Sequence, residues 1–187
     1  MKKTMMAVLA LFIMLPALVF AQKGYAIDKG VMIIDGSAGY FSAGGDLFES
    51  DGDGRITSLY INPHLDYFIV PHVAIGAAFN FGKWSHGDHS TTEYGVGPTA
   101  AFFLGNPNSK IYPFIRGSFF YDITSNDLDY KRTIIRFSGG AAFMVAKNVA
   151  ITGGAFYTIE SNKEEGADES VSGNIFGITF GIAAFVY

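Results

Sequence analysis

Side chains alternate between apolar and polar types along most of this chain, with a period of two residues. The segment from Thr57 to Ile69 shows the alternation clearly: Leu59, Ile61 and Leu65 occupy odd positions, while polar residues occupy most of the even ones. A period of two places successive side chains on opposite faces of a β-strand. The segment is longer than an ordinary strand of about 5–6 residues. It is long enough to cross a bilayer, which takes about 9–11 residues.

The same pattern recurs along the chain, and we expect eight strands. The last strand is apolar on both faces, so the sequence does not assign the face that contacts lipid. The connections between them alternate between short turns (70–71, 105–110, 147–148) and longer polar loops (42–54, 84–92, 123–131, 161–170). Alternating connections and an even strand number are typical of an outer-membrane β-barrel, with both termini on the periplasmic side. The alternative is a soluble lipocalin-like barrel or sandwich. The expected strands are residues 31–41, 57–69, 73–81, 94–104, 111–121, 133–145, 149–159 and 174–187.

The first 21 residues indicate a secretory signal peptide. Lys2 and Lys3 precede an apolar stretch from Met5 to Phe20, and Ala21 ends a cleavage site. The alternative is a membrane anchor helix, but the run is short for spanning. We therefore divide the chain into a signal peptide, residues 1–21, and a barrel domain, residues 22–187. The chain has no cysteine, so neither a disulfide nor a lipid-attachment cysteine is available.

The composition narrows the class of partner. Removing Lys2 and Lys3 leaves 11 basic and 17 acidic residues, a net charge of −6, which argues against nucleic-acid binding. The 23 glycines and 18 phenylalanines are typical of a chain with many strands and turns.

Aromatic rings favour the depth of lipid headgroups. We expect two aromatic girdles, one near the long loops (Tyr40, Phe81, Tyr94, Tyr121, Tyr157) and one near the short turns (Tyr67, Phe102, Phe143, Phe185, Tyr187).

Three stretches carry a resemblance to a known family: GVMIIDGSAGY in the first expected strand, INPHLDYFIVPHVAIGAAFNF across a tight turn, and GIAAFVY at the end. With them the chain resembles the small eight-stranded outer-membrane barrels, which include OmpX-like and OmpA-like barrel domains. The resemblance covers the whole mature chain and implies an all-β, antiparallel up-and-down transmembrane barrel. It also implies that Phe185 and Tyr187 form a terminal signal for the barrel-assembly machinery. Function does not follow, because such folds host unrelated activities.

The lumen of an eight-stranded barrel is just wide enough to be filled by side chains. Buried charges must be paired. We therefore expect Arg116 and Arg136 to pair with Asp35, Asp66 or Glu160, which would fill the lumen and block conduction. The polar residues expected to point inward are Asp35, Asn62, His64, Asp66, Arg116, Arg136 and Glu160.

The segment ESDGDGRITSLY, residues 49–60, resembles the first half of a helical calcium loop. That loop requires a Glu at its twelfth position, where this chain has Tyr60, so we reject it. A weak surface calcium site remains as an alternative to plain turn chemistry. Its ligands would be Asp46, Glu49, Asp51 and Asp53. His86, Asp88 and His89 could hold zinc or copper, but no fourth ligand is evident.

We expect an integral outer-membrane protein with a structural or surface-interaction role: membrane integrity, adhesion or loop-mediated binding. We expect no cofactor and no enzymatic activity, and we expect lipopolysaccharide and divalent cations at the acidic loops as partners. Two alternatives stay open. One is a narrow channel or carrier for small or hydrophobic solutes. The other is a lipid A-modifying enzyme, for which we find no convincing Ser and His pair facing lipid.

Overall fold

The structure is a computed structural model of the 187-residue chain, and it describes residues 26–43, 56–86, 89–125, 130–164 and 171–187. The expected signal peptide lies outside these residues. None of the described residues form a helix long and apolar enough to cross a membrane. The described residues form eight strands: β1 (Met32–Ala43), β2 (Ile56–Val70), β3 (Val73–His86), β4 (His89–Phe103), β5 (Ile111–Ser125), β6 (Tyr130–Ala146), β7 (Val149–Glu164) and β8 (Val171–Val186).

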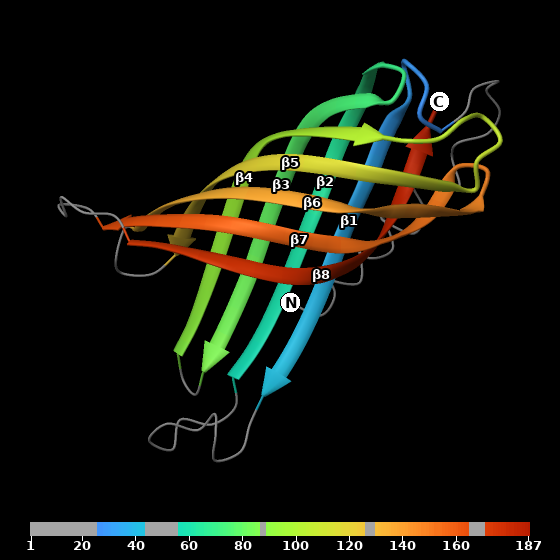
Figure 1. The fold of residues 1–187 in the computed structure, drawn as a ribbon. Helices are drawn as coiled ribbons and strands as arrows, with labels where there is room; N and C mark the ends of the chain where they lie inside the picture. Colours follow the sequence, from blue (N-terminus) through green and yellow to red (C-terminus); the bar gives the residue numbers. More distant parts are fainter. Residues whose placement is uncertain (1–25, 44–55, 87–88, 126–129, 165–170) are drawn as a thin grey trace.

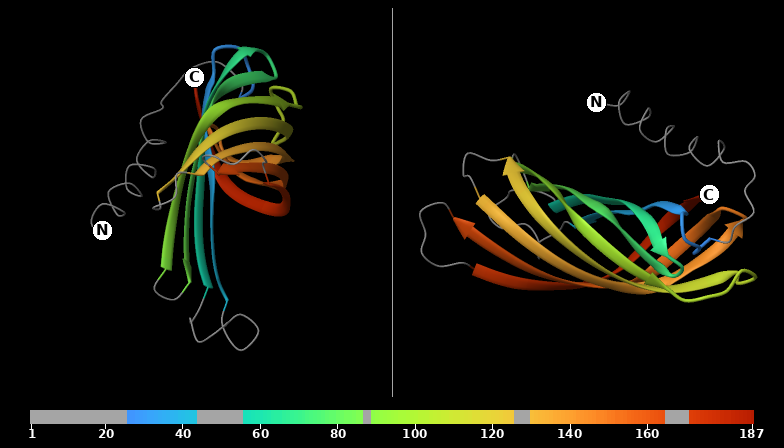
Figure 2. Two further views of the ribbon diagram at one scale, coloured as in Figure 1. Left: turned by 90° about the vertical axis from the view of Figure 1, so that its left-hand side faces the viewer. Right: turned by 90° about the horizontal axis from the view of Figure 1, so that it is seen from above.

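The strands form a single closed barrel in which each strand pairs with its neighbours in sequence and β8 pairs with β1 (Figure 1). All pairs are antiparallel. The expected fold class, an all-β up-and-down barrel of eight antiparallel strands, is confirmed. The C terminus lies at the end of the barrel that carries the short turns, and we call this the short-turn end (Figure 2).

The strands are longer than the sequence predicted, and the long connections are correspondingly shorter. Pairing between β3 and β4 continues to His86 and His89, so the outer connection predicted at 84–92 shrinks to two residues. Backbone pairing continues beyond the apolar part of these two strands, although the side chains there are polar. Across this hairpin, the hydroxyl of Ser85 donates a hydrogen bond to the hydroxyl of Ser90. The sequence analysis ended each strand where its apolar residues end. A strand ends instead where its backbone hydrogen bonds to the neighbouring strand end.

The period-two alternation sorts the side chains into two faces. Large apolar side chains such as Leu65, Ile115 and Phe137 are exposed on the outer face, while Asn62, Asp66 and Ser118 are buried inside. The structure also assigns the faces of β8. Phe176 and Ile178 point outward and are strongly exposed, whereas Ala183 is buried. An outer face of exposed apolar side chains around a closed sheet is the arrangement that lipid requires.

The aromatic girdles agree with the prediction in most positions and differ in one. Tyr94, Tyr121 and Tyr157 are exposed towards the long-loop end, and Tyr67, Phe102 and Phe143 towards the short-turn end. The side chain of Tyr40 lies outside the described residues. Phe185 was predicted to lie in the girdle, and this was wrong, because it is fully buried in the interior core. It follows Ala183 by two residues and therefore shares its inward face.

Residues that precede β1 close the short-turn end. Ala26 and Ile27 are buried against the barrel interior. The backbone of Ile27 accepts a hydrogen bond of 3.0 Å from the N–H of His72 in the β2–β3 turn. His72 has a φ of +74°, which few residues with a side chain adopt. Its ring nitrogen Nδ1 lies 3.0 Å from the carbonyl oxygen of Phe103, so the turn is held by both backbone and side chain.

Candidate functional site

The lumen is filled in its short-turn half by an apolar cluster. Ile27, Ile33, Phe68 and Phe185 have no exposed surface, and the rings of Phe68 and Phe103 meet edge to face with centroids 5.5 Å apart. Ile33, Phe68 and Phe185 lie on the inward faces of β1, β2 and β8, and Ile27 comes from the residues that precede β1. Close-packed apolar side chains leave no continuous path for water or ions.

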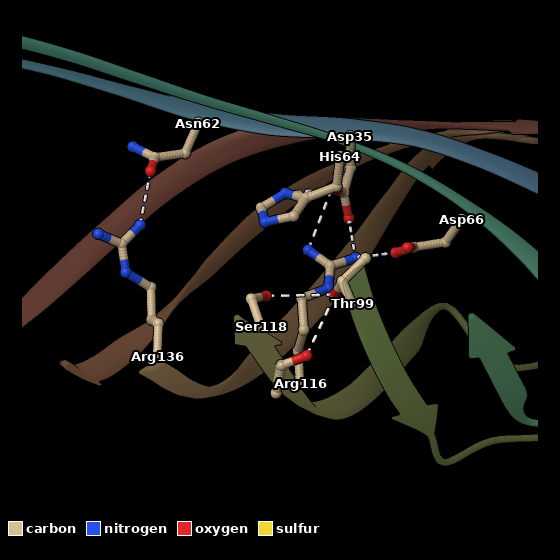
Figure 3. A network of polar contacts seen from close by, with 9 residues as sticks. Asp35, Asn62, His64, Asp66, Thr99, Arg116, Ser118 and Arg136 are labelled. Atoms are coloured by element: carbon tan, nitrogen blue, oxygen red, sulfur yellow. Dashed lines mark hydrogen bonds and ion pairs between the residues drawn. The ribbon is translucent and has the colours of Figure 1, made fainter. Parts of the chain in front are cut away.

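Above this cluster, Arg116 on β5 binds two carboxylates that reach it from the opposite wall (Figure 3). It donates hydrogen bonds of 3.0 and 2.5 Å to the two oxygens of Asp35 on β1, and a third of 2.8 Å to Asp66 on β2. All three residues are buried. His64 joins the group, with its Nδ1 atom 2.9 Å from Asp35. A guanidinium that binds both oxygens of a carboxylate forms one of the stronger charged contacts in proteins.

Two further arginines lie nearer the long-loop end, both on β6. Arg136 donates to Asn62 and Thr158 at 2.5 and 3.1 Å. Its guanidinium lies over two aromatic rings, 5.4 Å from the centre of Phe120 and 5.2 Å from that of Phe156. These contacts join β2, β6 and β7 across the interior. Arginine favours such places because its flat guanidinium both donates hydrogen bonds and stacks on rings.

Arg132 is the lumen residue that the sequence analysis missed. It forms ion pairs of 2.8 Å with Glu93 on β4 and 2.5 Å with Glu160 on β7. The predicted loop ended at residue 131 and the predicted sixth strand began at residue 133, so Arg132 was left outside every predicted strand. Its position four residues before Arg136 gives both side chains the same inward phase, and this spacing was the available signal.

The structure places all seven predicted lumen residues on the inner face. The predicted pairing of Arg116 with Asp35 and Asp66 is present. Glu160 pairs with Arg132, and Arg136 donates to neutral oxygens instead. The predicted calcium ligands Asp46, Glu49, Asp51 and Asp53 lie outside the described residues, as do the side chains of His86 and His89. The described part of the chain contains no cluster of three His, Cys, Asp or Glu side chains suited to a metal ion.

The long-loop half of the lumen holds a cavity of about 340 Å³. Arg116 lies at its floor, and Ser58 and Trp84 line it towards the long-loop end. Its lining also includes Arg132, Arg136, Glu93 and Glu160. The cavity has the size of a small-molecule site, and its surface is mostly apolar, with charged and polar groups set into it.

The predicted assembly signal lies at the end of β8 and just after it. Phe185 is part of the apolar cluster, and the hydroxyl of Tyr187 donates a 3.2 Å hydrogen bond to the carbonyl oxygen of Lys147. Both residues therefore hold the last strand to the short-turn end of the folded barrel. Their role as an assembly signal stays a prediction.

No protein-family model matches the chain, and no curated protein matches it in sequence. The solved structures that are similar in fold include two with TM-scores above 0.5. The crystal structure of Neisserial surface protein A (NspA) has a TM-score of 0.55 at 15% identity, covering 83% of this chain and 97% of that one. The outer membrane protein OprG from Pseudomonas aeruginosa has a TM-score of 0.53 at 11% identity, covering 88% of this chain and 98% of that one.

These similarities confirm the fold, that of a small eight-stranded outer-membrane barrel. The exposed apolar side chains around the outer wall give this barrel a surface suited to hydrocarbon and unsuited to water. The fold and this outer surface together are those of a transmembrane β-barrel.

Proposed function

We propose that this protein is a non-conducting barrel that serves the outer membrane as a structural and surface-binding element. The observation that carries the proposal is that two buried groups of side chains lie across the lumen. Ile27, Phe68 and Phe185 are fully buried at the short-turn end, and the Arg116 ion pairs with Asp35 and Asp66 lie directly above them. A solute could pass only by displacing the apolar cluster and separating the Arg116 ion pairs. Separating a buried ion pair costs about 3–5 kcal/mol.

A barrel that conducts nothing can still act on the membrane and at its own outer end. The long loops are rich in carboxylates, with Asp46, Glu49, Asp51 and Asp53 in the first, and with Glu165, Asp168 and Glu169 in the last, directly after Glu164 at the end of β7. We propose that these carboxylates attract divalent cations, which bridge to the phosphates of neighbouring lipopolysaccharide, or that they bind a basic partner. Adhesion and membrane integrity are the activities that such contacts support.

The barrel-assembly machinery is the second partner that we propose. The sequence ends on Tyr187, with Phe185 two positions earlier, in the pattern typical of small outer-membrane barrels. Replacing Tyr187 by Ser should reduce the amount of folded barrel in cells far more than it reduces refolding of the purified chain in detergent, where only the contacts of Tyr187 within the barrel, such as its hydrogen bond to Lys147, are lost. Equal loss in both settings would instead assign Tyr187 a purely structural role.

A cell-based comparison tests the surface role. Cells that lack the protein should become more sensitive to chelators and lose adhesion, and the wild-type gene should restore both. A variant with Asp46, Glu49, Asp51 and Asp53 changed to Asn or Gln should restore neither fully, although its barrel still folds and resists heat on gels. Normal adhesion and normal chelator sensitivity in the neutralised variant would overturn the proposed role of these loops.

The cavity favours a second candidate, a carrier for small or hydrophobic solutes, because about 340 Å³ of space lies open to a ligand within the lumen. A lipid A-modifying enzyme is less well supported. The two histidines with described side chains are both engaged, His64 with Asp35 inside the lumen and His72 with Phe103 at the short-turn end. Mass spectra of lipid A from cells with and without the protein should be identical; a defined mass change would make it an enzyme.

A further inference from the structure

The barrel is closed between β1 and β8 along only part of their length. Backbone pairing runs from Met32 and Val186 to Ser37 and Gly181, and it ends there. β1 continues to Ala43 against β2, and β8 begins at Val171 against β7. Figure 1 shows the two strands together near the C terminus and then diverging across the barrel. We call the unpaired interval between Ala38–Ala43 of β1 and Val171–Phe180 of β8 the seam.

Exposure of β8 shows that the seam is open on both sides of the wall. Phe176, Ile178 and Phe180 point outward and are 65–73% exposed, more than most outward residues of the other strands. Ile175 points inward and lines the cavity, yet it is 47% exposed. An inward side chain in a fully paired wall would be covered by the neighbouring strand.

The cavity reaches the seam from inside. Its lining includes Gly36 and Ser37 at the last paired position of β1, and Ile175 and Thr179 on the facing edge of β8. The hydroxyl oxygen of Thr179 is buried and has no hydrogen-bond partner among the described residues. Buried hydroxyl groups are usually satisfied, so this one marks a position where a polar group of a ligand or a water molecule belongs.

Aromatic rings line the inner walls beside the seam. The ring of Tyr60 lies across Gly39 on β1, and the ring of Phe156 lies across Gly177 on β8, so closely that a side chain on either glycine would overlap a ring. Such covering supports strand glycines near an edge. It also gives the cavity apolar walls next to the seam, while Arg136, stacked on Phe156, supplies a polar group further inside.

A barrel wall with unpaired strand edges is not stable in direct contact with hydrocarbon. Unpaired strand edges in lipid leave backbone N–H and C=O groups without partners, and irregular backbone at membrane depth is tolerated only where it lines a cavity or is covered. Here the edges border a cavity that carries charged and polar groups on one side and the apolar outer face on the other. The molecule that fits both surroundings has a polar head and a single apolar chain.

We propose that the seam and the adjoining cavity form a binding site for a single-chain amphiphile that enters from the membrane. The apolar chain lies in the seam against Ile175, and the polar head lies in the cavity near Thr179 and Arg136. A volume of about 340 Å³ is at the small end of ligand sites and suits one chain rather than the two chains of a phospholipid. The site goes beyond the proposed surface role and does not depend on it.

The chain offers a built-in reporter for this site, because Trp84 is the only tryptophan and lines the cavity. The protein is folded into phosphatidylcholine vesicles and titrated with 12-bromododecanoic acid, since bromine quenches tryptophan fluorescence at short range. Unbrominated dodecanoic acid serves as competitor. We expect saturable quenching of Trp84 that the competitor reverses. Quenching that is absent, or that grows without saturation, would overturn the site.

Closing the seam tests the route. The chain has no cysteine, so Ala38→Cys with Phe180→Cys introduces a single pair one step beyond the last backbone pairing. After folding, the pair is bridged by oxidation or, where the thiols are too far apart for a disulfide, by a short bis-maleimide. The bridge should abolish the saturable quenching, while the same sample before bridging keeps it.

Ala155→Cys with Ile178→Cys is the matched control, because these outward positions face each other in the paired β7–β8 wall. Bridging this control pair should leave quenching unchanged. Equal quenching before and after bridging at the seam would show entry from the outer mouth and overturn the proposal. Equal quenching of Trp84 by vesicles of chain-brominated phosphatidylcholine without added probe would identify a membrane phospholipid as the occupant, and would overturn the single-chain assignment.

Discussion

Arg116 and Asp35 are joined across the barrel by two hydrogen bonds of 3.0 and 2.5 Å, although 81 residues separate them in the chain. The contact links β5 to β1, strands that are not neighbours in the wall. Asp66 adds a third hydrogen bond from β2. Because β1 is also the strand that closes the barrel with β8, this buried group stabilises the wall next to its shortest pairing.

Replacing Arg116 by Met should lower the free energy of unfolding by about 3–5 kcal/mol, because Asp35 and Asp66 would remain buried without a cationic partner. Unfolding by urea in detergent micelles, followed on gels or by circular dichroism, measures the change. The triple variant R116M with D35N and D66N is the control. It removes all three charges and should recover much of the lost stability. Equal destabilisation of both variants would show that packing, not charge pairing, explains the effect.

Phe68→Ala should destabilise the barrel by about 3–5 kcal/mol, because it removes a fully buried ring and leaves a cavity in the apolar cluster. Phe102→Ala is the matched control, because Phe102 is exposed on the outer face of the same end. In micelles the control should have the smaller effect. A larger loss for Phe102→Ala would contradict the inward assignment of Phe68.

Ile115→Arg should cost about 2–4 kcal/mol in lipid vesicles, because a charge on the outer face near the middle of the apolar belt must leave water for hydrocarbon. Tyr121→Arg, on the same face of β5 but nearer the long-loop end, should cost about 0–1 kcal/mol. Equilibrium unfolding in vesicles compares the two. Equal costs would mean that the outer face of β5 does not cross the hydrocarbon.

Gly140→Val should destabilise the wall by about 1–3 kcal/mol, because Gly140 faces Gly154 so closely that an added Cβ would lie 2.3 Å from the carbonyl oxygen of Gly153. Gly117→Ala is the control, since a Cβ there meets nothing within 4 Å. Unfolding of both variants in micelles provides the comparison. A stable Gly140→Val barrel would show that β6 and β7 can separate at little cost.

The period-two pattern predicted both the strands and the face of each lumen residue, because alternation directly determines which way a strand side chain points. Asp35, Asn62 and Arg136 were assigned to the lumen in this way. The sequence predicted only some of the contacts among the lumen residues. Arg116 can reach Asp35 because their strands lie opposite each other, and that depends on the curvature of the closed wall, not on local sequence.

The errors have related causes. Arg132 was missed because the polar stretch directly before it was assigned to a loop, whereas backbone pairing continues through it. Phe185 was placed in the girdle from its closeness to a turn, whereas its spacing from Thr179 and Ala183 gives it the inward face. The alternation of apolar and polar residues does not predict the seam. The seam depends on the length over which β1 and β8 pair once the other seven strand pairs have formed.

The central claim is that the lumen is occluded, and single-channel recording in a planar lipid bilayer tests it most directly. The wild-type protein should give no steps of porin size at any applied voltage. A variant that weakens both layers, Phe68→Ala with Arg116→Ala, should show intermittent currents if it folds. Stable porin-sized steps from the wild-type protein would contradict the account, because the apolar cluster and the Arg116 ion pairs could not then block the path.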